Sequence, residues 1–262
     1  MSDYELDPLP YEYDALEPHI SEQVLTWHHD THHQGYVNGW NAAEETLADN
    51  RDAGEFGSSA GALRNVTHNG SGHILHDLFW QNMSPEGGDE PSGALADRIA
   101  EDFGSYEAWK GEFEAAAGAA GGWALLVYDS FSNQLRNVVV DKHDQGALWG
   151  SHPILALDVW EHSYYHDYGP ARGDFVSAFF EVVDWALLVY DSFSNQLRNV
   201  VVDKHDQGAL WGSHPILALD VWEHSYYHDY GPARGDFVSA FFEVVDWDEP
   251  AARYEQAVEL FE

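Results

Sequence analysis

The sequence predicts an α+β protein, in which an N-terminal helical hairpin domain is followed by a C-terminal domain of a small antiparallel sheet with flanking helices. Three observations support this prediction. Apolar residues recur at helical spacing over residues 21–49 and 60–83. Short apolar runs typical of strands follow later in the chain. Between the two patterns, the polar and turn-rich segment 84–93 predicts a domain boundary.

The first two predicted helices account for an N-terminal domain over residues 1–84. The segment that joins them, residues 50–59, is rich in glycine, aspartate and serine and predicts a turn. We therefore expect the helices to form a hairpin. Residues 85–93 are then expected to link it to a C-terminal domain, residues 94–262.

The second domain should begin with an alanine-rich helix over residues 94–120, which Gly121 and Gly122 end. Strands are predicted next, two of them around the turn at residues 130–133. Helices and an amphipathic C-terminal stretch complete the domain. The expected strands are 123–129, 134–141 and 152–160, and the expected helical segments are 161–168, 173–184 and 250–261.

Residues 123–184 recur without a single change as residues 185–246. Solenoid repeats vary from copy to copy and recur at shorter periods, so this pattern is not typical of a solenoid. It indicates either a recent tandem duplication or an error in assembling the sequence. Removing either copy leaves the same 200-residue chain, and one copy is surplus to a single fold.

Composition excludes several classes of function. The chain has 46 acidic and 11 basic residues, a formal net charge of -35, so we expect it to bind neither nucleic acid nor anionic membranes. Screening at molar salt, where the Debye length is about 3 Å, relieves the self-repulsion and suggests a salt-rich cytoplasm. Without cysteine, any metal must sit on histidines and carboxylates. We find no signal peptide or spanning segment and expect a cytoplasmic protein.

Histidines cluster on the two N-terminal helices. His28, His32 and Tyr36 are spaced so that they share one helix face, with about 40° between neighbours. On the second helix His76 follows His73 by one turn. A lone histidine on an apolar helix is more often a hydrogen-bonded core residue than a ligand, so these residues alone do not decide between a metal site and a core.

The strongest local signal is Asp158, which ends an apolar strand four residues before His162. A buried carboxylate needs a cation, a metal or a hydrogen-bond network. The alternative is a helix-capping aspartate beside a surface histidine. Three neutral imidazoles and one carboxylate would suit iron, manganese or zinc and would be poor for copper(I).

Four motifs stand in order along the chain: PLPYEYDALEPHI, HHDTHHQGYVN, HILHDLFW and DVWEHSYYHDYG. In their order and spacing they resemble the iron/manganese superoxide dismutases, over nearly the whole chain once one copy of the repeat is discounted. The resemblance implies an enzyme that converts two superoxide anions and two protons to oxygen and hydrogen peroxide. It also implies one redox-cycling Mn or Fe ion per subunit and a salt-adapted archaeal type.

Carried over position by position, the resemblance assigns roles to individual residues. The metal ligands it implies are His28, His76, Asp158 and His162, with solvent as the fifth ligand. His32 and Tyr36 match the pair that controls access and relays protons, and the aromatic residues around the metal match Trp80, Trp123 and Trp160. At a twofold interface, Glu161 should reach a metal-ligating histidine of the partner subunit. Tyr165 matches the other interface residue, near the entrance of the site. The resemblance therefore implies a homodimer or a tetramer.

Two positions depart from the family's common pattern. Leu75 replaces an asparagine, which alters packing rather than ligation. His143 takes the place of a glutamine that donates a hydrogen bond to the solvent ligand, as in an archaeal and actinobacterial variant. Because that donor tunes the metal potential, the choice between Mn and Fe stays open. Because the net charge of -35 repels the anionic superoxide, the mouth of the site should be less acidic than the rest of the surface. Arg172 is the candidate for a basic residue at this mouth.

Other interpretations stay open at this stage. The sixteen histidines could serve a metal-buffering protein, or the duplication could have made an inactive fold. The second copy could also build the site in place of the first. It would then supply Asp220 and His224, surrounded by Trp185, His205, Glu223 and Tyr227. We favour the first copy, because it adjoins the helical domain and forms first during synthesis.

Overall fold

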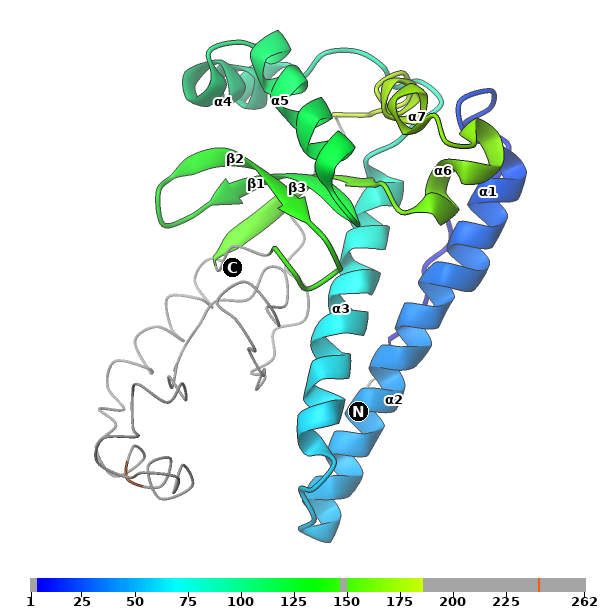
Figure 1. Ribbon diagram of the computed structural model, residues 1–262, viewed down its shortest axis with the longest axis vertical. Helices are drawn as coiled ribbons and strands as arrows, with labels where there is room; N and C mark the ends of the chain where they lie inside the picture. Colours follow the sequence, from blue (N-terminus) through cyan, green and yellow to red (C-terminus); the bar gives the residue numbers. More distant parts are fainter. Residues whose placement is uncertain (1–3, 147–149, 186–239, 241–262) are drawn as a thin grey trace. The chain divides into compact units, whose positions relative to one another are not determined.

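The computed structural model describes residues 4–146, 150–185 and 240 (Figure 1). The chain forms two compact units, Met1–Ser213 and His214–Glu262. Every helix and strand described below lies in the first unit. The amphipathic segment predicted over residues 250–261 lies outside the described residues. Among the helices that are described, none is both long and apolar enough to cross a membrane.

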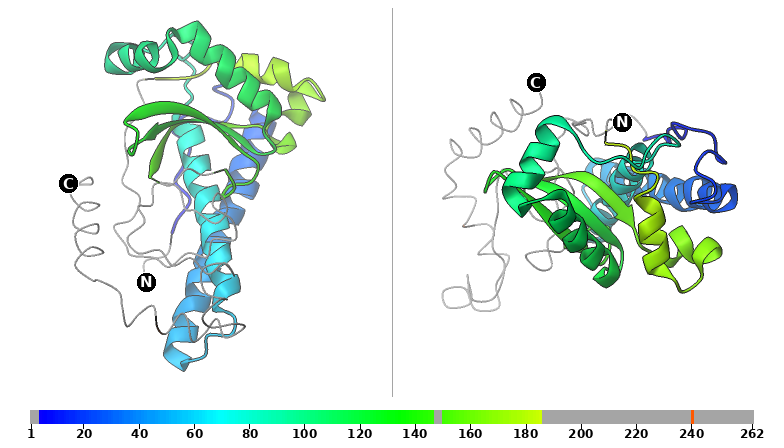
Figure 2. Two further views of the ribbon diagram at one scale, coloured as in Figure 1. Left: turned by 60° about the vertical axis from the view of Figure 1, so that its left-hand side comes forward. Right: turned by 90° about the horizontal axis from the view of Figure 1, so that it is seen from above.

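The N-terminal part is the expected helical hairpin. Its first arm consists of α1 (Glu22–Trp27), one π-helical turn η1 (His28–His33) and α2 (Gln34–Ala53), which follow one another without a break. The second arm, α3 (Ser59–Gln81), lies alongside α2 in both figures (Figures 1 and 2).

The ends of the first arm follow from local chemistry. Ser21 caps α1, because its side chain accepts a hydrogen bond from the Val24 backbone N–H. The arm ends at Gly54, whose φ of 70° is a left-handed conformation that glycine adopts without steric cost. The helix therefore runs four residues beyond the predicted end at residue 49.

The prediction of one helix over residues 94–120 is wrong. The structure has two helices, α4 (Gly93–Phe103) and α5 (Tyr106–Ala119). Gly104, with a φ of 91°, stops the first helix, and Ser105 caps the second by accepting a hydrogen bond from the Ala108 backbone N–H. Gly104, a helix stop signal, and Ser105, a helix start signal, stand next to each other in the alanine-rich segment, and the prediction of a single helix missed both.

The sheet has three strands: β1 (Trp123–Asp129), β2 (Gln134–Val140) and β3 (Ser151–Asp158). They are antiparallel in the order β2-β1-β3, which confirms the predicted α+β class. The central strand β1 is almost wholly buried. Helix α5 packs on β1 and β2, whereas α3 packs on β3 (Figure 2).

Two short helices, α6 (Glu161–Tyr168) and α7 (Arg172–Phe179), follow the sheet. The second helix was expected to continue to residue 184. Instead, the chain leaves the helix after Phe179 and returns to the end of α3. There the backbone N–H of Asp184 donates to the Asn82 carbonyl at 2.8 Å, and that of Ser84 donates to the Val182 carbonyl at 2.8 Å. The last residues of the first copy are thus held against the segment that follows α3.

Candidate metal centre

Asp158, the last residue of β3, is fully buried and its two carboxylate oxygens have different surroundings. Oδ1 accepts a hydrogen bond from the Trp160 backbone N–H at 2.9 Å. Oδ2 faces three imidazole nitrogens, Nε2 of His28 at 3.1 Å, of His162 at 3.4 Å and of His76 at 3.5 Å. The backbone contact at Oδ1 therefore aims one carboxylate oxygen at the three rings.

Four elements from distant parts of the sequence bring this cluster together. The ligand atoms of His28 (η1), His76 (α3), Asp158 (β3) and His162 (α6) all lie within 4.8 Å of one another. In the part of the chain that the structure describes, it is the one group of three or more histidines and carboxylates placed to hold a metal ion.

Hydrogen bonding prepares the imidazoles for a metal. The Nδ1 of His76 lies 2.6 Å from the Gly72 carbonyl, to which it can only donate, so its Nε2 carries a lone pair. Within the described residues, Nε2 of His76 and of His162 have no hydrogen-bond partner. Leaving buried polar atoms unpaired costs free energy, and a cation accepting these lone pairs would remove the cost. The residues present therefore fit a metal ion.

Burial keeps two of the imidazoles, those of His28 and His76, in the neutral form that a metal requires. It lowers the pKa of His28 to about 4 and that of His76 well below its usual value. Burial alone would raise the pKa of Asp158, but the close approach of the His162 and His28 imidazoles outweighs it and holds that pKa well below its usual value. Three neutral imidazoles with an ionised carboxylate would form a site of charge -1, a nitrogen and oxygen donor set that suits Fe, Mn and Zn.

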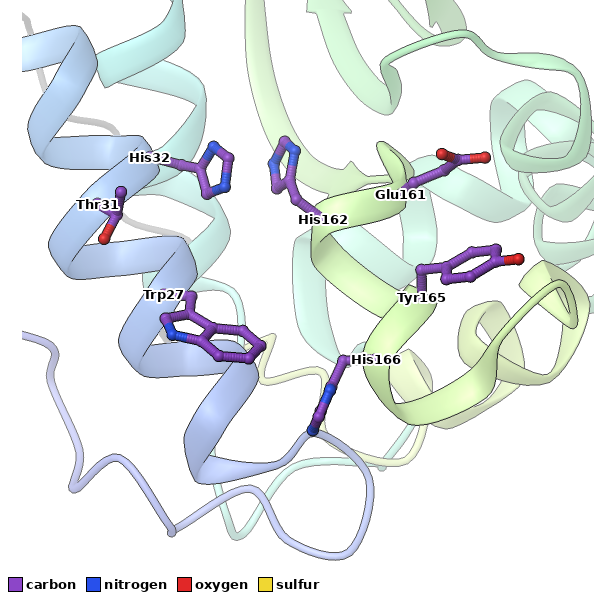
Figure 3. Close-up of a pocket in the computed structure, with 7 residues that line it drawn as sticks. All are labelled: Trp27, Thr31, His32, Glu161, His162, Tyr165 and His166. Atoms are coloured by element: carbon purple, nitrogen blue, oxygen red, sulfur yellow. The ribbon is translucent and has the colours of Figure 1, made fainter.

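A pocket of about 270 Å³ opens next to the cluster (Figure 3). In Figure 3, His32 and His162 face each other between η1 and α6, with their rings stacked at 4.2 Å. The pocket reaches the cluster through His162, whose side chain is 19% exposed. Its lining residues are Trp27, Thr31, His32, Glu161, His162, Tyr165 and His166.

Tyr36 and His143 contact the cluster and are absent from the pocket lining. The Tyr36 ring lies 5.1 Å from that of His76 and 4.4 Å from that of His143. Burial, and secondarily the charge of Asp158, raises the pKa of Tyr36 to about 12, so the phenol keeps its proton at neutral pH. Trp123 Nε1 donates to Nδ1 of His143 at 3.0 Å, and burial lowers the pKa of this histidine to about 3.

Comparison with known proteins decides the family. Residues 3–84 match the alpha-hairpin domain of the iron/manganese superoxide dismutases, and residues 91–188 and 184–253 each match their C-terminal domain. This chain belongs to the iron/manganese superoxide dismutases. The predicted family and enzyme activity are confirmed, whereas the metal-buffering and inactive alternatives gain no support.

Three relatives of this superoxide dismutase come from halophilic archaea. Superoxide dismutase [Mn] 1 of Haloferax volcanii is 75% identical over 262 residues, covering all of both chains. Superoxide dismutase [Mn] 1 of Halobacterium salinarum is 83% identical over 185 residues, 71% of this chain and 92% of the relative. Superoxide dismutase [Mn] 1 of Haloferax mediterranei is 94% identical over 144 residues, 55% of this chain and all of the relative.

The other residues singled out from the sequence of this dismutase divide into two groups. Trp80 and Trp160 lie beside the cluster, with ring centroids 4.8 Å from His28 and 6.4 Å from His162 respectively. Glu161 and Tyr165 are exposed on α6, and Figure 3 shows both directed away from His32. The exposed pair is thus accessible to another molecule at the rim of the pocket.

Arg172 does not serve the mouth of the pocket in this dismutase. Its guanidinium donates to the Ala120 carbonyl at 2.9 Å and to the Ala117 carbonyl at 3.5 Å. Ala117 lies in the last turn of α5, and Ala120 follows the end of that helix. The residue is absent from the pocket lining. It therefore ties α7 to α5.

The residues considered for the second copy fall into two cases. Trp185 donates from Nε1 to the Asp89 carbonyl at 2.9 Å and packs on Trp109, while Trp123 occupies the position beside His76. The others lie outside the described residues: His205, Asp220, Glu223, His224 and Tyr227.

Three side-chain contacts had no signal in the sequence. Nε2 of His33 lies 2.6 Å from Nδ1 of His73, and Trp80 Nε1 donates to the other nitrogen of His33 at 3.0 Å. His68 and Asp144 approach each other at 3.5 Å. The residues of these pairs are 40, 47 and 76 positions apart, so only the three-dimensional fold reveals the contacts.

Proposed function

We propose that this superoxide dismutase works with one manganese ion per chain, held by His28, His76, Asp158 and His162. The observation that carries the proposal is the single oxygen of Asp158 facing three imidazole Nε2 atoms at 3.1–3.5 Å. The donor set suits either Mn or Fe. The names of the relatives, all superoxide dismutases [Mn], favour manganese.

The protein side chains divide the remaining work. Two superoxide anions and two protons yield oxygen and hydrogen peroxide, and the bound metal supplies the one-electron redox change. We assign the admission of the anion to His32, which lines the pocket beside His162. Tyr36, a neutral phenol with a pKa of about 12, holds a proton that it can donate toward the cluster. We assign to His143, whose ring lies 4.4 Å from that of Tyr36, the positioning of the hydrogen bonds around this phenol.

Self-association is part of the proposal. Glu161 and Tyr165 are exposed on α6, next to the ligand His162 and at the rim of the pocket. A second copy of the chain bound beside this rim would add to the walls of the entrance that His32 and His162 line. We propose a homodimer or tetramer built on this face, in a salt-rich cytoplasm suited to the charge of -35, with no nucleic-acid or membrane partner.

We further propose that the first copy of the repeat supplies the site. The whole cluster is built from residues up to 162, and the hairpin that provides His28 and His76 occurs once in the chain. Asp158→Ala should therefore abolish superoxide dismutation and manganese binding, while Asp220→Ala, its counterpart in the second copy, leaves both unchanged. The reverse pattern would assign the site to the second copy.

Metal analysis of the purified full-length chain tests the function itself. We expect about one manganese per chain and superoxide-dismuting activity that is lost on chelation and restored by Mn. His76→Gln, which removes one ligand, should lose both metal and activity. Several exchangeable metals per chain without activity would instead indicate metal buffering.

A further inference from the structure

Three side chains behind the metal ligands form a hydrogen-bonded bridge between two helices. Nε1 of Trp80, on α3, donates to Nδ1 of His33, on η1, at 3.0 Å. Nε2 of His33 lies 2.6 Å from Nδ1 of His73, which is again on α3. Trp80 and His33 are buried. The Trp80–His33–His73 bridge therefore ties η1 to α3 twice, and these two elements carry the ligands His28 and His76.

The direction of each bond in the bridge is fixed by its first donor. An indole N–H can only donate, so Nδ1 of His33 carries a lone pair and the proton of this ring sits on Nε2. Nε2 of His33 then donates to Nδ1 of His73. A 180° flip of the His33 ring would put carbon atoms at both nitrogen positions and lose both bonds. The bridge thus holds this ring in one orientation.

Both members of the first bond also pack on a metal ligand. The His33 ring is stacked on that of His76, with centroids 5.2 Å apart and planes 22° apart. The Trp80 ring meets that of His28 at 4.8 Å and 78°. The Gly72 carbonyl holds one edge of the His76 ring through Nδ1, and His33 adds a contact on its face.

The π-helical turn η1 explains why a residue five positions after His28 can join this arrangement. An α-helix turns by about 100° per residue, which would place His33 about 140° around the axis from His28. In a π-helical turn the bonds run from residue i to i+5, so the two residues come close to one face. Trp80 accordingly contacts both rings, with centroids 4.8 Å from His28 and 6.4 Å from His33.

We propose that His33 is a positioning residue of the metal centre, whose bonds to Trp80 and His73 fix how closely η1 approaches α3. The bridge thereby sets the separation and tilt of the His28 and His76 rings. This inference rests on the proposed function, because it assumes that these two ligands bind manganese. His33 itself offers no nitrogen to the metal, since both of its nitrogens are engaged in the bridge. Partners of this kind typically change metal affinity about 10–100-fold when they are replaced.

The test compares His33→Phe and Trp80→Phe in the full-length, manganese-loaded protein. Each variant keeps an aromatic ring beside its ligand and removes the hydrogen bond between the two residues. We expect each to release manganese to a chelator about tenfold faster or more. The electron paramagnetic resonance spectrum of bound Mn(II), which responds to the placement of the ligands, should change in both. Both residues lie outside the repeated segment, so each substitution affects the enzyme whichever copy completes the site.

The double variant measures the coupling between the two residues. Because both changes remove the same bond, the double variant should release manganese more slowly than the product of the two separate increases. Increases that multiply would mean that His33 and Trp80 act independently, and would overturn the bridge as the cause.

Trp109→Phe is the matched control. Trp109 is also buried and donates from Nε1 at 3.0 Å, to Asn137. Its printed ring partners are Tyr106, Phe113, Phe180 and Trp185. This variant should lower the melting temperature of the metal-free protein, with manganese release and the Mn(II) spectrum as in the wild type.

The outcomes separate the two proposals. Wild-type manganese release and a wild-type spectrum in His33→Phe and Trp80→Phe would overturn the positioning role. So would faster release that follows melting temperature alike in all three single variants, because it would then reflect stability alone. A wild-type protein that binds no manganese would overturn the proposed function instead.

Discussion

Buried histidines make the stability of the metal-free protein sensitive to acid. Burial is the main cause that lowers the pKa of His28 to about 4, of His143 to about 3 and of His33 to about 2, against an ordinary value of 6.5. From pH 6.5 down to about 4, the unfolded chain therefore binds protons that the folded chain does not. The stability contributed by neutral burial is complete above pH 6.5 and is lost as the pH falls.

We expect the free energy of unfolding of the metal-free protein to decrease by about 1.4 kcal/mol per pH unit for each such histidine in this window. Urea denaturation at about pH 8, 6 and 5 measures the change. His33→Gln should lessen the pH dependence by about one proton, because it removes one group that titrates only after unfolding. An equal pH dependence in the two proteins would count against this assignment.

How far single residues could be predicted depends on what their roles require. Asp158 and His162 stood out because a carboxylate after an apolar strand needs a partner, and the structure places that partner beside it. The pairing of His33 with His73 could not be predicted, because nothing in either local sequence encodes a contact across 40 residues.

At the scale of elements, the π-helical turn η1 changes what the histidine spacing does. Regular α-helical geometry predicted His28, His32 and Tyr36 on one face. The i to i+5 bonding of the turn, seen where the Gln34 backbone N–H donates to the His29 carbonyl, adds a residue to the turn. In the structure, His32 stacks on His162 at the pocket while Tyr36 lies against His143. The sequence thus predicted the residues of the site better than their arrangement around it.

Gly72, on α3, leaves room for the ring of Tyr36. A Cβ at this position would lie 2.8 Å from two ring atoms of Tyr36. The Gly72 carbonyl also accepts a hydrogen bond from His76. We expect Gly72→Ala to displace the phenol, lower kcat and destabilise the fold by about 1–3 kcal/mol.

Gly61→Ala on the same helix is the matched control, because nothing lies within 4 Å of its added Cβ. This change should preserve kcat and stabilise the helix by up to about 1 kcal/mol. Activity measurements and thermal unfolding compare the two variants. Equal behaviour of both would show that the approach of Tyr36 to α3 is unimportant.

For the molecule as a whole, charge determines the conditions in which it folds. With 46 acidic and 11 basic residues, self-repulsion opposes the compact state, and salt relieves it by shortening the Debye length from about 10 Å at 0.1 M to about 3 Å at 1 M. We therefore expect the melting temperature to fall as KCl is diluted over this range. Choline chloride should protect equally if screening is the cause, whereas protection by K⁺ alone would point to specific ion binding.

The repeat poses the last question at this scale, because the chain has one helical hairpin and two copies of the segment that completes a metal site. The 185 aligned residues are 92% of the Halobacterium salinarum relative, which is therefore about 200 residues long, the length of this chain without one copy. Deleting residues 185–246 joins Asp184 to Trp247, and tryptophan also follows Asp184 in the full chain, so the local sequence is preserved.

The described helices, the sheet and the cluster all lie within residues 4–185. We therefore expect the shortened chain to bind about one manganese and to keep the kcat of the full chain, as measured by metal analysis and superoxide consumption. It should also aggregate less, because residues 185–246 repeat the apolar runs of the first copy, while the sequence of the hairpin that covers them occurs once. Loss of metal and activity on deletion would mean that residues 185–246 contribute to the site, and that the two copies act together.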